Sequence, residues 1–172
     1  NMLDDTLSDT TAPGSNPLAS ATALVAAINA ARATTGVSAT ALPATSVGSA
    51  TDVSVPATGT YTLYINGTAI DVAMTQPAPA DDLVQAAAGR RAAVVAAVNW
   101  ASARTSVRAE DNGLGVSLSA VDGRNLSLWY DGSVPGLQAA SFGLDPATVP
   151  GASIDPVTGA VTGAATLYGR VQ

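Results

Sequence analysis

Apolar residues recur at helical spacing in two stretches of the chain, and they alternate with polar residues in the segments that follow each stretch. Leu24, Ile28 and Ala31 fall at positions i, i+4 and i+7, the spacing of one face of an α-helix. The equivalent positions in the second stretch are Val94, Val98 and Ala101. Alternation over short runs bounded by Gly and Asn is typical of strands. The pattern therefore predicts helices that are each followed by antiparallel strands.

The two helical stretches belong to an internal repeat. Residues 23–39 align without a gap with residues 93–109, and ten of the seventeen positions are identical. Alanine accounts for many of these identities, but four involve other residue types. They pair Val25 with Val95, Asn29 with Asn99, Thr35 with Thr105 and Val37 with Val107. We therefore expect one helix-and-strand unit to occur twice, with Gly36 ending the first helix in a left-handed conformation and Ser106 in that place in the second.

Two Asn-Gly pairs predict tight hairpins, because a type I′ turn needs positive φ at both central residues. A two-residue turn at Asn66-Gly67 sets apolar residues opposite one another, and so does one at Asn112-Gly113. The first pairs Leu63 with Ile70 and Tyr61 with Val72, and the second pairs Val107 with Leu118 and Ala109 with Val116.

A third strand is expected after the turn at Asp122-Gly123. Only an odd-length loop keeps the apolar residues of this strand on the same face as those of the strand before it. It pairs Leu118 with Leu128 and Val116 with Tyr130. The turn is therefore predicted to have three or five residues and a glycine-type bulge.

The predicted fold class is α+β, with two tandem units of a helix and a three-stranded antiparallel meander, and mostly irregular or β terminal segments. The segments are an extended arm (1–16), a first helix-meander unit (17–75), a linker (76–88), a second unit (89–131) and a loop-rich segment with a closing strand (132–172). A loop-like insertion at 43–59, with a candidate short strand at Asp52–Val55, interrupts the first unit. Phe142–Leu144 is expected to anchor the last segment, and Thr166–Gln172 to form its strand. Each helix is expected to cover its own meander.

The composition excludes several kinds of chemistry. The 172 residues include no Cys and no His, so thiolate sites and a Ser-His-Asp triad are impossible within the chain. The net charge of −6, with seven Arg and no Lys, argues against binding to nucleic acid or to an anionic membrane. No apolar run is long enough for a transmembrane helix. We expect a non-enzymatic protein without cofactor or metal.

The remaining candidates each have a structural and a chemical interpretation. Asn29 and Asn99 bond the helix to the adjacent strand or contact a ligand. The acidic residues Glu110, Asp111 and Asp122 form turns or act as acid and base in sugar hydrolysis. The pairs Asp4-Asp5 and Asp81-Asp82 are expected to be solvated charges, with metal or acid–base chemistry as the alternative. Arg90-Arg91 is expected to solvate a helix face, with binding of an acidic partner as the alternative. Trp100 replaces Ala30 of the first copy. It fills a gap between the copies, packs beneath a loop or forms a binding hot spot.

The repeat resembles the "IN" motif of bacterial flagellins. In that motif a helix with Ile-Asn precedes a T-G-V-x-A strand, and V-A-A-I-N with T-G-V-S-A at residues 25–39 is similar to it. Its twin is V-A-A-V-N with T-S-V-R-A at 95–109, where Val98 replaces Ile and Ser106 replaces Gly. The motif continues with Y-I-N-G at Tyr64–Gly67 and A-V-D-G-R-N at Ala120–Asn125. The resemblance covers roughly residues 18–130.

The resemblance implies a central, variable outer domain of a flagellar filament subunit, located outside the cell and exported unfolded. Its partners would be other flagellin subunits, reached through terminal regions missing from this chain, so the fragment is expected to be monomeric. A hook-associated or cap protein shares the motif and is an alternative. Another is a carbohydrate-binding or adhesive module that uses Tyr64, Trp100 or Trp129 to contact a surface glycan or a host.

Overall fold

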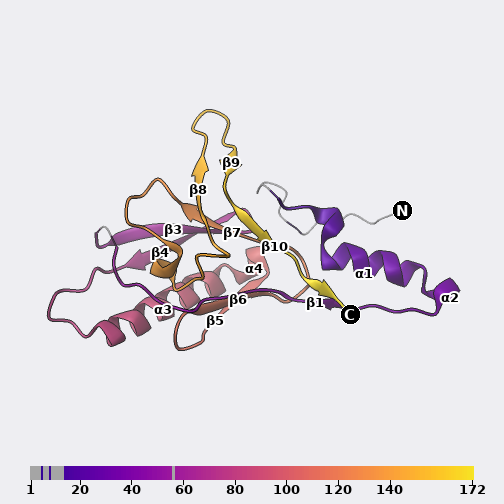
Figure 1. Cartoon of the computed structure of the whole chain (residues 1–172), viewed down its shortest axis with the longest axis horizontal. Coiled ribbons are helices and arrows are strands. Elements are labelled where there is room, and N and C mark those ends of the chain that lie inside the picture. Colours follow the sequence, from indigo (N-terminus) through magenta and orange to yellow (C-terminus); the bar gives the residue numbers. More distant parts are fainter. Residues whose placement is uncertain (1–4, 6–7, 9–13, 56) are drawn as a thin grey trace.

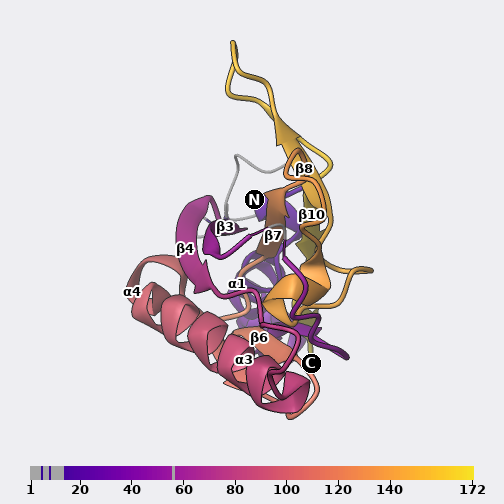
Figure 2. The same cartoon turned by 90° about the vertical axis from the view of Figure 1, so that its left-hand side faces the viewer.

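The computed structural model describes Asp5, Ser8, residues 14–55 and residues 57–172, and it has the predicted α+β class. The long helix α3 lies beside the sheets (Figures 1 and 2), whereas α1 and α2 lie at the opposite end of the molecule (Figure 1). The helical segments are η1 (Pro17–Ala19), α1 (Ala21–Ala30), α2 (Arg32–Thr35), α3 (Leu83–Trp100), α4 (Ser102–Thr105) and η2 (Ala139–Phe142).

The strands of the described residues form three sheets. The largest has the order β4-β3-β7-β8-β9, with β10 also paired to β7, the second has the order β2-β6-β5, and the third pairs β1 with β11. The strands are β1 (Ala41–Leu42), β2 (Ala44–Val47), β3 (Gly59–Ile65), β4 (Thr68–Met74), β5 (Val107–Asp111), β6 (Val116–Ala120), β7 (Leu126–Asp131), β8 (Gly151–Ile154), β9 (Val161–Thr162), β10 (Ala165–Leu167) and β11 (Arg170–Val171). Both larger sheets therefore combine strands from the two copies of the repeat.

The helix starts follow the capping signals in the sequence. Ser20 caps α1, and its Oγ accepts a hydrogen bond of 3.1 Å from Ala23 N. Asp82 caps α3, because its Oδ1 accepts from the backbone N–H groups of Val84 and Gln85. The second helix thus begins at Leu83 and continues through residue 89, where the second unit was predicted to begin. The predicted linker 76–88 contains its first turns.

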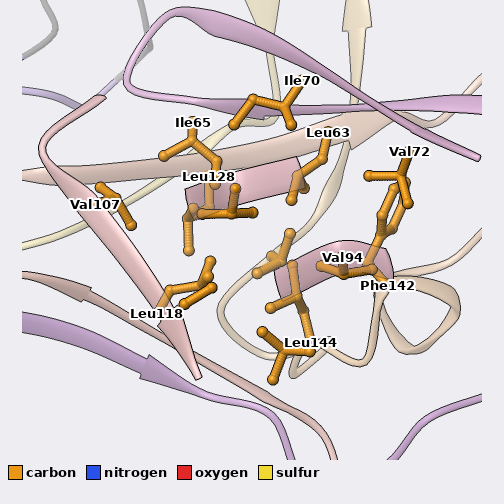
Figure 3. Close-up of a cluster of buried hydrophobic side chains, with 14 of the residues drawn as sticks. Leu63, Ile65, Ile70, Val72, Val94, Val107, Leu118, Leu128, Phe142 and Leu144 are labelled. Carbon is orange, nitrogen blue, oxygen red and sulfur yellow. The ribbon is translucent and has the colours of Figure 1, made fainter. Parts of the chain in front are cut away.

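The hydrophobic core is built around α3. Val94 and Val98 on its apolar stripe are fully buried, and α3 packs against β4 from the first copy and against β5 and β6 from the second. Figure 3 shows Val94 near Phe142 and Leu144 within this core. The largest fully buried side chains are Phe142, Leu63, Ile65, Met74, Leu118, Leu126, Leu128, Leu144, Val72, Val94, Val98 and Val107. One helix therefore covers hairpins from both copies, and the expectation that each helix covers its own meander is wrong for the first copy.

The hairpin of β3 and β4 has the predicted register. Its pairs include Leu63 with Ile70 and Tyr61 with Val72. Asn66 has φ 47° and Gly67 has φ 72°, as a type I′ turn requires. The Asn66 side chain also joins the two copies, because its Oδ1 accepts from Ser127 N and its Nδ2 donates to Thr105 O.

The hairpin of β5 and β6 keeps apolar residues opposite one another, but its predicted register is wrong. The observed pairs are Asp111 with Val116, Ala109 with Leu118 and Val107 with Ala120. The loop is longer than a two-residue turn because Asn112 Oδ1 accepts from the N–H groups of both Leu114 and Gly115. The shift by two residues preserves the buried face, since side chains alternate with a period of two.

The third strand of the second unit does not pair with the second. Strand β7 pairs with β3, β8 and β10, so the predicted pairs Leu118–Leu128 and Val116–Tyr130 are wrong, and so is the predicted hairpin turn between β6 and β7. The physical reason is that β2, from the insertion at 43–59, occupies the edge of β6 that β7 would need. The possible strand at Asp52–Val55 is not formed, although Val55 is buried.

The terminal segments are fixed by a few side chains. Phe142 and Leu144 are fully buried, as predicted for the anchor, and flank the left-handed Gly143. The predicted closing strand is divided into β10 and β11 at Tyr168-Gly169. The predicted arm 1–16 is described only at Asp5, Ser8 and from Gly14 on, and Asp5 is buried rather than solvated. Asp4 lies outside the described residues.

Three backbone segments cross at Gly48, Gly115 and Gly143 without room for side chains. Gly143 O accepts a hydrogen bond of 2.7 Å from Val116 N, and Gly48 N donates 3.0 Å to Val116 O. A Cβ on Gly48 would collide with Gly143 O, and one on Gly115 would lie 2.5 Å from the same oxygen. This crossing attaches the loop after η2 to the sheet of β2, β6 and β5.

Gly48→Ala should therefore lower the free energy of unfolding by about 2 kcal/mol or more, because backbone atoms must move to admit the methyl group. Gly89→Ala is the matched control. Gly89 lies within α3 with no atom near its Cβ position, so this change should raise the free energy of unfolding by about 0.5–1 kcal/mol. Urea unfolding of both variants measures the difference, and equal effects would refute the steric account.

Candidate functional site

The candidate residues singled out by the repeat form the same helix-to-strand junction twice. Asn29 Nδ2 donates to Ala39 O at 3.0 Å, and Ala39 N donates to Asn29 Oδ1 at 2.9 Å. In the second copy, Asn99 makes both equivalent bonds to Ala109 at 2.9 Å. Each amide side chain therefore bonds both backbone groups of a residue in the segment that follows its helix. The expected bond between helix and strand is present in the second copy, where Ala109 lies in β5, whereas Ala39 of the first copy lies two residues before β1.

A threonine completes the junction in each copy. Thr35 Oγ1 donates to Ala31 O and accepts from Val37 N, and Thr105 makes the corresponding bonds to Ala101 and Val107. The next residue is left-handed in both copies, with φ 71° at Gly36 and φ 54° at Ser106. A non-glycine residue in this conformation is strained, and the surrounding bonds hold it there. We name residues 28–39 and 98–109 the first and second Asn junctions.

The other predicted site residues lie at three separate turns. Asn66 and Gly67 form the turn of β3 and β4, and Asn112 and Gly113 that of β5 and β6. Asp122 and Gly123 lie between β6 and β7, where Thr22 Oγ1 donates to Asp122 O at 3.0 Å. Gly123 has φ 78°, and a Cβ there would lie 2.5 Å from the Cβ of Ala41. The structure thus does not bring these residues together into one site.

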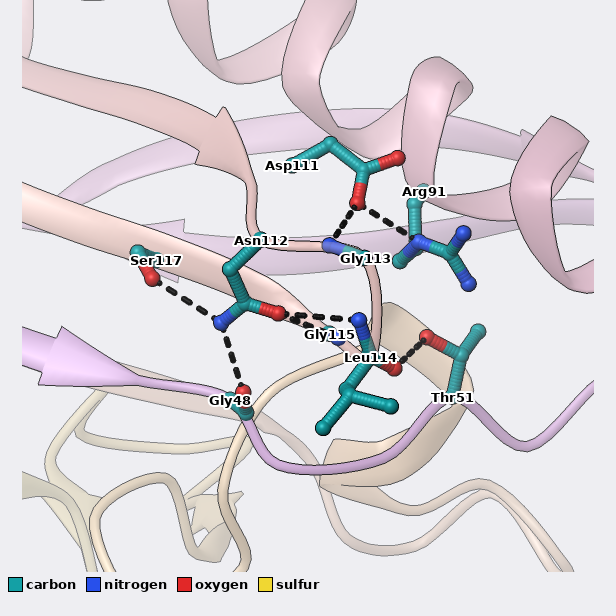
Figure 4. A network of polar contacts seen from close by, with 9 residues as sticks. All are labelled: Gly48, Thr51, Arg91, Asp111, Asn112, Gly113, Leu114, Gly115 and Ser117. Carbon is teal, nitrogen blue, oxygen red and sulfur yellow. Dashed lines mark hydrogen bonds and ion pairs between the residues drawn. The ribbon is translucent and has the colours of Figure 1, made fainter.

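The most extensive polar network surrounds Asn112 (Figure 4). Besides the two bonds that its Oδ1 accepts within the turn, Asn112 Nδ2 donates to Gly48 O at 2.8 Å and to Ser117 Oγ at 3.0 Å. Thr51 Oγ1 donates to Leu114 O at 2.8 Å. The network therefore connects the β5–β6 turn to the insertion of the first copy, and its role is to join backbone segments.

Of the three carboxylates considered for acid–base chemistry, Asp111 and Asp122 take part in turns and ion pairs, whereas Glu110 lies within β5, opposite Ser117. Asp111 Oδ1 accepts from Gly113 N and from Arg91 Nε, each at 2.7 Å. The hydrogen bond from Gly113 lowers the pKa of Asp111 the most, and Arg91 lowers it further. Asp122 pairs with Arg124 at 2.6 Å. In the part of the chain that the structure describes, no group of three His, Cys, Asp or Glu residues is placed to hold a metal ion.

Arg90 was expected to be solvated, but it is buried. Its guanidinium donates to Thr75 O at 2.8 Å and, at 3.2 Å, to the carbonyl oxygens of Val53 and Ser141. Burial lowers the pKa of Arg90, and the charge of Asp52 partly opposes this. The side chain therefore ties α3 to three other segments. The position of Arg90 in the sequence indicates this burial, because Arg90 lies four residues before Val94 and therefore on the same face of the helix.

Trp100 does not fill a gap between the copies. It is 87 % exposed at the end of α3, and the prediction that it packs inside is wrong. Trp129 is instead buried in β7 and stacks on Tyr64, with ring centroids 3.6 Å apart. Of the three aromatics considered for an adhesive surface, Trp100 is thus the one that is fully presented to solvent.

Comparisons with protein-family models, with curated proteins and with solved structures found no match for this chain. Among the described residues, no helix has the length and apolar character needed to cross a bilayer. The two Asn junctions are therefore the feature on which a functional interpretation rests.

Asn99→Ala should lower the free energy of unfolding by about 1–3 kcal/mol, because both backbone groups of Ala109 lose their partner beside the core. Asn29→Ala is the matched control. It removes the same two bonds from the exposed segment that precedes β1, so its effect on global unfolding should be much smaller. Denaturant unfolding of both variants measures the two losses, and losses of equal size would contradict the different roles of the junctions.

Proposed function

We propose that the chain is a structural, non-catalytic, surface-exposed domain of a bacterial flagellar filament subunit. The observation that carries this proposal is the Asn junction, which occurs twice with the same hydrogen bonds. The residues that resemble the flagellin motif are the ones that make these bonds. Their role is to hold a helix and a strand at a fixed angle, which is what a repeated structural module requires.

The relative position of the two ends of the fold supports an inserted domain. Asn16 N donates to Tyr168 Oη at 3.2 Å, and Tyr168 Oη donates to Gly14 O. A domain whose first and last segments lie side by side fits within another domain without distorting it. In a filament subunit, the host would be the part that polymerises.

The surface also fits an outer position. The chain has a net charge of −6 and contains no Lys. Repulsion between like charges keeps neighbouring subunits soluble and apart. Asp82 caps α3, and Asp111 and Asp122 form ion pairs with Arg91 and Arg124. The partners of such a domain are other filament subunits, which it meets through regions outside this chain, and its location is extracellular.

Antibodies raised against this chain provide the test on intact cells of the source organism. Immunogold electron microscopy should show label along the whole length of the flagellar filaments. Label only at the hook–filament junction or only at the filament tip would overturn the proposal in favour of a hook-associated or cap protein. Absence of label from flagella would overturn the flagellar assignment altogether. Cells that lack filaments serve as the control for label elsewhere on the surface.

A further inference from the structure

Strand β4 has an open backbone edge on the side away from β3. It is the last strand of the largest sheet, and no strand of the described residues lies beside its outer edge (Figure 2). Asn66 N donates to Ser127 O, so the even-numbered residues along β3 direct their backbone groups toward β7 and the odd-numbered ones toward β4. The register of the hairpin then turns the N–H and C=O groups of Ala69, Asp71 and Ala73 to the outer edge. These three residues are exposed, and their outward groups make no hydrogen bond to any described residue.

The edge of β5 in the second sheet is treated differently. Asn99 accepts from the N–H of Ala109 and donates to its C=O, each at 2.9 Å, and so closes that edge. Helix α3 packs against both β5 and β4. It therefore closes one strand edge with a side chain and leaves the other open.

A furrow separates the open edge of β4 from α3. One hollow of about 330 Å³ lies beside the first residues of β4 and is lined on α3 by Ala97 and Trp100. Another of about 350 Å³ lies beside the last residues of β4 and is lined on α3 by Gly89 and Ala93. A Cβ on Gly89 would meet no atom within 4 Å. We call the space between residues 69–73 and α3 the β4 furrow, and it leaves room for a further strand.

Asp71 determines which strand fits the β4 furrow. It is the middle residue of the open edge, so a second copy of β4 that bonded the whole edge would set its own Asp71 directly opposite. Like charges in that position are destabilising, whereas a basic residue there is favoured. The Asp71 carboxylate lies on the exposed face of the sheet, where it accepts 2.8 Å from Thr62 Oγ1. A cation opposite Asp71 therefore lies on that face, away from Arg104, which lines the furrow on the side of the helices.

We propose that the β4 furrow binds an extended segment of a different protein as an added antiparallel strand. The segment has Lys or Arg opposite Asp71. The residues before and after it are apolar, because they point toward α3 on the same face as the buried Val72 and Ile70. Bonds to the outward backbone groups supply the pairing, and the alternating side chains supply the selectivity.

The proposal does not depend on the flagellar assignment, and the peptide acetyl-Thr-Val-Lys-Val-Thr-amide tests it on the full chain. At a peptide concentration of twice the Kd found by NMR titration, the amides of Ala69, Asp71 and Ala73 should exchange with solvent about threefold more slowly. The control is the same peptide with a methyl group on the backbone nitrogen of its lysine. It keeps every side chain but loses the N–H that bonds Asp71 O, so it should leave the exchange unchanged.

Exchange of Glu for Lys in the peptide tests the role of the charge. The Glu peptide should bind the chain about fivefold more weakly than the Lys peptide, and the Asp71→Lys variant should reverse this preference. The same preference in both proteins would overturn the choice of a basic segment.

Equal slowing by the methylated peptide, or no slowing by either peptide, would overturn the proposal of an added strand. Sedimentation equilibrium of the chain alone tests the rival occupant. A monomer supports the proposal. A dimer that Ala73→Pro dissociates would overturn it in favour of a second copy, because this change removes an outward N–H without touching the bonds to β3.

Discussion

The burial of one side of α3 is the interaction on which the rest of the structure depends. The chain has few aromatic residues, so its core consists mainly of Val, Leu and Ile, and one helix is shared between the hairpins of both copies. Val94 and Val98 supply the apolar contact. Arg90, one turn earlier, bonds the backbone of the segments that surround it. Because α3 covers both hairpins, α1 is left outside the core.

The repeat shows that the same local structure can be packed differently in the two copies. The bonds of Asn29 and Asn99 connect residues ten positions apart, so each junction forms from its own segment. What covers the junction is decided elsewhere in the chain. The helix of the second junction packs against β4 and β6, whereas the first junction has only the short pair of β1 and β11 beside it. One motif therefore gives a closed core in one place and an exposed segment in the other.

The sequence predicted the features that depend on neighbouring residues. These include the left-handed turn at Gly36 and the register set by Asn66-Gly67. Prediction from the sequence was wrong where distant segments compete for the same strand edge. Strand β2 pairs with the edge of β6 that β7 was expected to occupy, and β7 pairs with β3 in another sheet. No pattern among neighbouring residues predicts this. The register of β5 and β6 depends on two bonds from one Asn112 oxygen, which the Asn-Gly pair alone does not reveal.

Residue-resolved hydrogen exchange under native conditions tests the central claim, that α3 belongs to the shared core and α1 does not. Amides of α3 around Val94 and Val98 should exchange only through global unfolding, with the free energy found by denaturant titration. Amides of α1 around Val25 and Ile28 should exchange through a separate opening of lower free energy, while the rest of the protein stays folded. Equal protection of the two helices would contradict the account, because it would place α1 in the same cooperative unit as α3.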